Sequence, residues 1–162
     1  MSVPVLEAII LTLTPDGIRH VCPLETPTMQ LDWDEEFHPA EAIVDGVAAA
    51  GFAPFLVHAT SWRMDRGRLV LTFIVGVEGA APPMPDTTVM PSGFRSEAIG
   101  RAELVRGHAL GPPVDIEPMH VVEHGLRHLA WLVGDDPGIQ AALPAWLEAL
   151  EAYEPEPFRA FG

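Results

Sequence analysis

Alternating and continuous apolar segments predict two β-hairpins. Val3–Thr14 is rich in Val, Ile, Leu and Thr, and turn residues separate it from the extended pattern of Ile18–Leu24. Phe55–Arg63 and Arg68–Val77 form a second pair joined by a short polar connection. The last of these segments is apolar almost without alternation, which indicates a central strand covered by helices on both faces.

Two segments have helical periodicity. Pro39 suits a first helical turn, Ala40–Ala50 follows as mostly good helix formers, and Gly51 suits the helix end. Pro118–Gly134 repeats apolar residues at helical spacing. The opposite face of this second helix is polar and carries His120, His124, Arg127, His128 and Trp131, with Glu123 at its margin.

The remaining pattern completes a single α+β domain over residues 1–162. Residues 79–94 form a proline-rich loop, Ser96–Val105 fits a short helix or a strand equally, Gly138–Tyr153 should form a helical return interrupted at Pro144, and residues 154–162 form an irregular tail. The chain is 48% hydrophobic and 20% charged, which supplies enough apolar material for a core. We expect a mixed β-sheet flanked by helices.

Charge and cysteine content exclude several classes of function. The formal net charge of −14 disfavours nucleic acid and anionic membrane surfaces as partners. No apolar run is long enough to cross a bilayer. The N-terminal segment has no basic region and contains Glu7, so it reads as a strand and not as a secretion signal, and we expect cytoplasmic residence. Cys22 is the only cysteine, so an internal disulfide is excluded.

The segment HPAEAIVDGVAAAGF, His38–Phe52, resembles the helix of the Nudix box. The order of predicted strands and helices is also similar to that of the Nudix family. The positions that match the structural part of the box are Pro39, Ala42, Ile43, Val44, Val47, Gly51 and Phe52, with one residue fewer near the end. The resemblance implies a Nudix-like α/β/α sandwich.

The chemical part of the Nudix box is missing from this helix. The family uses glutamates to bind magnesium or manganese and to hydrolyse a diphosphate. Here Asp45 stands in place of the family's Arg, Gly46 in place of the next Glu, and alanines at 48–50 in the region of the Glu pair. Glu36 and Glu41 are nearby carboxylates. The resemblance therefore implies the fold more strongly than the activity.

A divalent-metal site can be placed on the histidine face of the second helix. His120, His124 and His128 are spaced at i, i+4 and i+8, which stacks their imidazoles on adjacent turns. Glu123, or a carboxylate from the acidic loop such as Glu36, is a candidate further ligand. The alternative is a polar helix face that contacts solvent or another subunit. Both interpretations remain open at the level of sequence.

A small-molecule site can be placed on the segment HATSWR. Strict alternation would put His58, Thr60 and Trp62 on one strand face, where imidazole, hydroxyl and indole could line a pocket. Arg63, with Arg66 and Arg68 nearby, could bind an anion or could simply keep a hairpin turn in contact with solvent. Trp131 needs cover from a subunit, the C-terminal helix or a ligand.

Two hypotheses follow for function. The first is a non-catalytic ligand-binding or protein-interaction domain. It would self-associate through the face of the second helix that carries the three histidines and Trp131. The second is a divergent metal-dependent hydrolase of a nucleotide-type or other small phosphorylated substrate. The sequence leaves open whether the chain is an enzyme.

Overall fold

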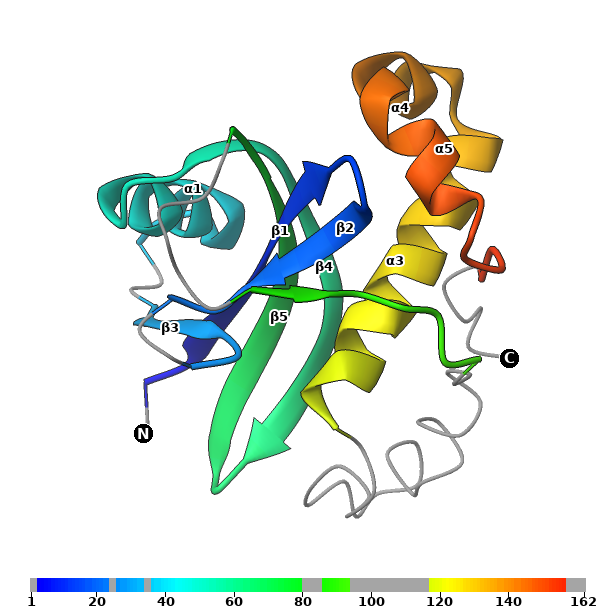
Figure 1. Ribbon diagram of the computed structural model, residues 1–162. Helices are drawn as coiled ribbons and strands as arrows, with labels where there is room; N and C mark the ends of the chain where they lie inside the picture. Colours follow the sequence, from blue (N-terminus) through cyan, green and yellow to red (C-terminus); the bar gives the residue numbers. More distant parts are fainter. Residues whose placement is uncertain (1–2, 24–25, 34–35, 80–85, 94–116, 157–162) are drawn as a thin grey trace.

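The computed structural model describes residues 3–23, 26–33, 36–79, 86–93 and 117–156. Within them the elements are β1 (Val5–Thr14), β2 (Gly17–Val21), β3 (Met29–Asp32), α1 (Pro39–Ala49), β4 (Ala53–Asp65), β5 (Arg68–Glu78), β6 (Asp86–Thr88), α3 (Pro118–Asp135), α4 (Pro137–Ala142), the 3₁₀ helix η2 (Pro144–Trp146) and α5 (Leu147–Leu150). These strands form one mixed, open sheet with helices on both faces, so the predicted α+β class is confirmed (Figure 1).

Strand β1 is the centre of the sheet. It pairs in parallel with β5 from Val5 to Thr12, and on its other edge it pairs antiparallel with β2 and β3. The order is β4-β5-β1-β2-β6, with β3 beside β1. Both predicted hairpins are confirmed, and β4 turns into β5 through Arg66 and Gly67, which both have positive φ, as a tight two-residue hairpin turn requires.

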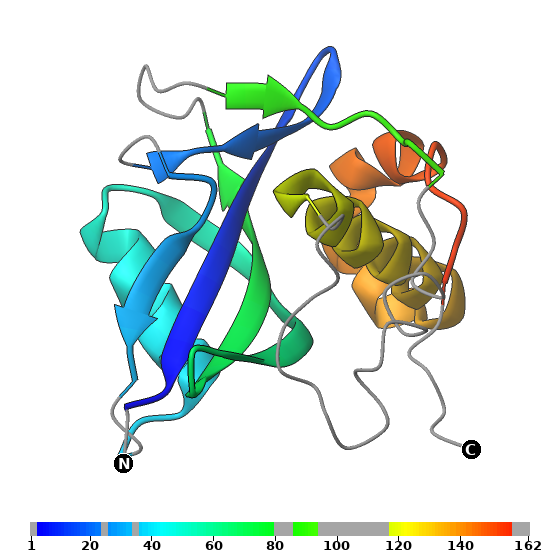
Figure 2. The ribbon, with the colours of Figure 1, turned by 90° about the horizontal axis from the view of Figure 1, so that it is seen from below.

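Each face of the sheet packs against a helix (Figure 2). On one face Ile43 and Val47 of α1 pack against β1 and β5. On the other, Val122, Leu126 and Leu129 of α3 join Ile9, Leu11 and Ile74 in a core that η2 and α5 complete. The expected burial of the β5 segment on both faces is therefore confirmed.

Two short strands were not predicted from the sequence. The loop predicted at 79–94 contains β6, and the acidic loop is preceded by β3. Strands of three and four residues are too short to show alternation, and their pairing depends on β1 and β2 being present. The Ser96–Val105 segment and residues 157–162 of the tail lie outside the described residues.

Candidate ligand-binding site

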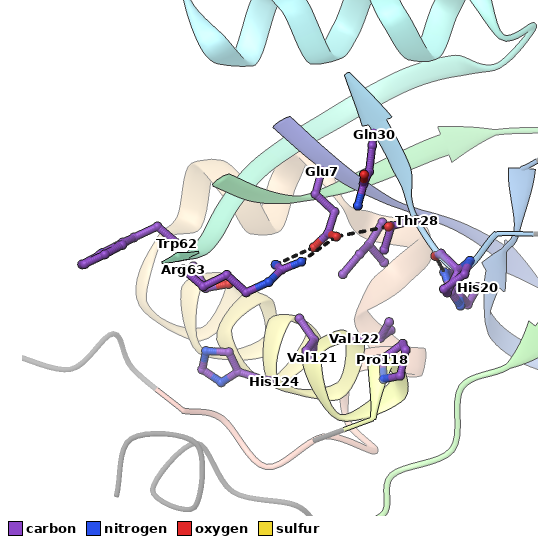
Figure 3. Close-up of a pocket in the computed structure, with 13 residues that line it drawn as sticks. Glu7, His20, Thr28, Gln30, Trp62, Arg63, Pro118, Val121, Val122 and His124 are labelled. Carbon is purple, nitrogen blue, oxygen red and sulfur yellow. Dashed lines mark hydrogen bonds and ion pairs between the residues drawn. The ribbon is translucent and has the colours of Figure 1, made fainter. Parts of the chain in front are cut away.

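A cavity of about 350 Å³ lies between the sheet and the first turns of α3 (Figure 3). Strands β1 to β4 supply its polar side, and α3 supplies most of its apolar wall. Helix α1, which carries the Nudix resemblance, covers the opposite face of the sheet (Figure 3). The residues that line the cavity are Glu7, Ile9, His20, Pro27, Thr28, Gln30, Ser61, Trp62, Arg63, Pro118, Val121, Val122 and His124.

An ion pair between Glu7 and Arg63 lies at the sheet side of the cavity. Arg63 donates from Nη1 to Glu7 Oε1 and from Nη2 to Oε2, both at 2.8 Å. Thr72 donates to Oε1 at 3.0 Å and Thr28 to Oε2 at 3.2 Å, so the carboxylate accepts four hydrogen bonds. The Glu7 side chain is 7% exposed and that of Arg63 is 25% exposed. Glu7 is thus a buried carboxylate with every acceptor position in use.

The ion pair fixes the charge state of both groups. Burial alone would raise the pKa of Glu7, but the hydrogen bonds and positive charge of Arg63, together with Thr72 and Thr28, outweigh it and lower that pKa. The hydrogen bonds from Arg63 to Glu7 raise the pKa of Arg63 despite its burial. Glu7 is therefore anionic and Arg63 cationic at neutral pH.

His20 forms another polar part of the lining. Its Nε2 lies 2.6 Å from the carbonyl oxygen of Pro27, which can only accept, so Nε2 carries the proton. Burial lowers the pKa of His20 although the Pro27 hydrogen bond opposes this shift. The ring is therefore neutral, and its bare Nδ1 lies 3.9 Å from Cys22 Sγ.

The sequence missed Glu7 as a site residue. A charged residue in the middle of an apolar strand is the available signal, because a buried carboxylate requires a partner. Nothing in the spacing identifies that partner, since Arg63 is distant in sequence and reaches Glu7 only through the β1-β5-β4 order.

The predicted ligand-binding residues divide into two groups. Trp62 and Arg63 line the cavity, although Trp62 is 59% exposed and its ring extends away from Glu7 (Figure 3). His58 instead contacts His128, with Nε2 and Nδ1 3.0 Å apart, and the His128 ring stacks on Trp131. The structure therefore does not bring all five predicted residues into one pocket.

A β-bulge explains this division. The pairing of β4 with β5 shifts between Ala59 and Ser61, which leaves Thr60 as an extra residue. Thr60 is buried and donates to the carbonyl oxygen of Thr72 at 3.2 Å. The alternation predicted for His58, Thr60 and Trp62 is therefore wrong beyond the bulge, where Ser61 and Arg63 line the cavity as well as Trp62.

The polar face of α3 is buried at Glu123, Arg127 and His128, contrary to its predicted exposure to solvent or to a partner. Glu123 accepts hydrogen bonds from the backbone N–H groups of Ser92 and Gly93 at 3.1 and 2.9 Å and from the Ser92 hydroxyl. Arg127 lies 3.4 Å from Glu123 through Nε, and its carbonyl oxygen accepts from Glu156 N. Chain segments that precede and follow α3 thus cover this face.

The four predicted metal ligands are not brought together. His120 Nδ1 accepts from Glu117 N at the start of α3, His124 lies 3.9 Å from a carboxylate oxygen of Glu156, and His128 contacts His58. Glu36 precedes α1, on the other side of the sheet. Within the described ranges, no three His, Cys, Asp or Glu side chains form a group that could hold a metal ion. Binding of a divalent metal stays a prediction.

The chain matches no known protein-family model, and no curated protein is similar to it in sequence. In the part of the chain that the structure describes, no helix has the length and apolar character needed to cross a membrane.

Proposed function

We propose that this chain is a non-catalytic ligand-binding domain that holds a small molecule in the cavity between the sheet and α3. The observation that carries the proposal is the ion pair of Glu7 and Arg63 at the edge of a cavity with an apolar wall. Small-molecule sites commonly combine apolar lining with a few fixed polar groups, and a volume of about 350 Å³ lies within their usual range.

The position of the ion pair favours a role in binding. A buried salt bridge contributes little net stability compared with apolar residues of similar volume, because both charges lose their hydration. Glu7 nevertheless lies on β1, the central strand, where apolar residues surround it in sequence. A charged pair at this position is better explained by the ligand it helps to bind than by the stability of the sheet.

The same contacts favour binding over catalysis. Glu7 accepts four hydrogen bonds and has a lowered pKa, which makes it a poor proton acceptor at neutral pH. His20 is neutral and its N–H is held by a carbonyl oxygen. These two groups are therefore arranged to stay in one protonation state.

Self-association, cytoplasmic residence and the Nudix-like character of the fold are further parts of the proposal that rest on the sequence alone. Since Glu123, Arg127 and His128 of α3 are buried within the chain, only the half-buried His120, His124 and Trp131 of the predicted face remain for a dimer contact. Exposed aromatic side chains, Phe37 and Trp62, are available elsewhere on the molecule.

Thermal melting in the presence of a panel of small metabolites tests the proposed function, because a compound that binds the folded state raises the melting temperature. Val121→Trp would fill the cavity and abolish these increases. Val44→Trp, on the partly exposed face of α1 across the sheet, is the matched control and should retain them. Equal increases in both variants, or no increase with any compound, would argue against the proposal.

A further inference from the structure

The guanidinium group of Arg63 has unused hydrogen-bonding capacity. Its two terminal nitrogens pair with the two oxygens of Glu7, and Nη1 also donates to Thr72 Oγ1 at 3.0 Å. These contacts use three of the five N–H groups that an arginine carries. The Nε–H and the second N–H of Nη2 have no acceptor among the described residues.

The two remaining donors lie on the same edge of the guanidinium plane. Nε and Nη2 present parallel N–H bonds, a geometry that matches the two oxygens of a carboxylate. Glu7 and Thr72 hold the other edge, so the free edge is fixed in orientation before a ligand arrives. Arg63 is part of the cavity lining, and Figure 3 shows its guanidinium group between Glu7 and the α3 turn that carries Val121.

From this geometry we infer that the ligand is a small carboxylic acid with an apolar body, whose carboxylate accepts two hydrogen bonds from the free edge of Arg63. The inference rests on the proposed binding function of the cavity. Ile9, Val121 and Val122 provide the surface against which the apolar body would pack. Gln30 and Ser61 are further polar residues of the lining and could bond a substituent on that body.

The charge balance makes the apolar body a necessary part of the ligand. Glu7 and Arg63 neutralise each other, so a bound carboxylate adds one uncompensated negative charge to a chain whose net charge is already −14. Bidentate hydrogen bonds to Arg63 offset part of that repulsion. Burial of apolar surface has to supply the rest, so acetate or phosphate alone should bind much more weakly than an acid with a ring or a branched chain.

Matched pairs of acids and amides test the inference on the unmodified protein. We would compare benzoate with benzamide, and cyclohexanecarboxylate with its primary amide, by NMR titration. An amide presents one acceptor oxygen and no charge, so each acid should bind at least about tenfold more tightly than its amide. The nine Lys and Arg residues of the chain are all arginine, so the spectrum contains nine arginine Nε–H groups. The Nε–H resonance of Arg63 should move downfield when an acid is added and should not move when an amide is added.

Arg63→Lys supplies a second measurement. Lysine keeps a positive charge near Glu7 but has no planar edge, so acid affinity should fall about tenfold while amide affinity changes little. Arg68→Lys, at the start of β5 and outside the cavity lining, is the control and should bind acids as the parent does.

The outcomes separate this inference from the proposed function. If amides bind as tightly as acids and Val121→Trp abolishes both, the cavity binds ligands but the carboxylate assignment is wrong. The same conclusion follows if neutral or cationic compounds of the metabolite panel bind there and the acids do not. If no compound of any charge binds, both proposals fail. If acids bind but the Arg63 Nε–H resonance does not move, recognition through Arg63 is refuted.

Discussion

Separating Glu7 from Arg63 tests whether their ion pair stabilises the fold. In Arg63→Met, a carboxylate that is only 7% exposed loses its cation and two of its four hydrogen bonds. Removal of one partner of a buried pair typically lowers the free energy of unfolding by about 3–5 kcal/mol. Glu7→Leu leaves Arg63, which is 25% exposed and reached by water, so its effect should lie nearer 3 kcal/mol.

The double variant Glu7→Leu/Arg63→Met should lose less free energy of unfolding than either single variant loses. Apolar residues of similar volume can replace a buried ion pair at little net expense, although the hydroxyls of Thr28 and Thr72 lose an acceptor at about 1 kcal/mol each. We therefore expect the double variant to be within about 2 kcal/mol of the parent. Urea unfolding of all four proteins at pH 7, with a double-mutant cycle, measures the coupling.

The dependence of stability on pH is an independent test of the ion pair between Glu7 and Arg63. In the parent, the pKa of Glu7 is lowered below 4.5, so its contribution to stability is complete at neutral pH and is lost as the pH falls below about 4.5. In Arg63→Met, burial dominates and should raise that pKa, so protonation relieves the buried charge. The stability difference between the two proteins should shrink from pH 7 to pH 4. A difference that is independent of pH, or additive single effects, would refute the reasoning.

Three further predictions concern α3 and its surroundings. An added Cβ at Gly134 would meet no atom within 4 Å apart from its chain neighbours and its own helix backbone, so Gly134→Ala should raise the free energy of unfolding by about 1 kcal/mol in urea unfolding. Gly125→Ala, whose Cβ would lie 2.1 Å from Ile74 Cδ1, should lower it by about 1–2 kcal/mol. Burial raises the pKa of Tyr153 to about 12, so the absorbance titration of this single tyrosine should show no ionisation at pH 10 in the folded protein, and ionisation there would contradict its hydrogen bond to the Val89 carbonyl. Burial and the neighbouring His58 lower the pKa of His128 to about 4 from 6.5, so stability should fall as the pH drops from 6.5 towards 4, and a His128→Leu variant should show a flatter profile in urea unfolding.

The sequence predicted those parts of the fold whose own side chains specify them. The β4-β5 hairpin and helices α1 and α3 have periodic or continuous apolar patterns over ten or more residues, and tertiary contacts reinforce that local preference. β3 and β6 exist because a neighbouring strand offers hydrogen bonds, so their own sequences carry little information.

The candidate site was harder to predict because it depends on contacts between distant residues. The bulge at Thr60 changes which β4 side chains face α3, and no residue type marks it in advance. Ser92 and Gly93 cover Glu123 of α3 and Glu156 contacts Arg127, and helical periodicity cannot predict these contacts. Arg63 was predicted to bind an anion, and in the structure it forms an ion pair with Glu7 of the same chain.

The parallel pairing of β1 with β5 has a consequence for synthesis of the chain. Glu7 on β1 pairs with Thr72 on β5, 65 residues later in the sequence, so the central strand cannot complete its pairing until the β4-β5 hairpin exists. At a synthesis rate of about 5–20 residues per second, the apolar β1 segment remains without its β5 partner for roughly 3–13 seconds after it is made. The local hairpins should therefore form first, and the ribosome-bound intermediate should be the state most exposed to aggregation and to chaperone capture.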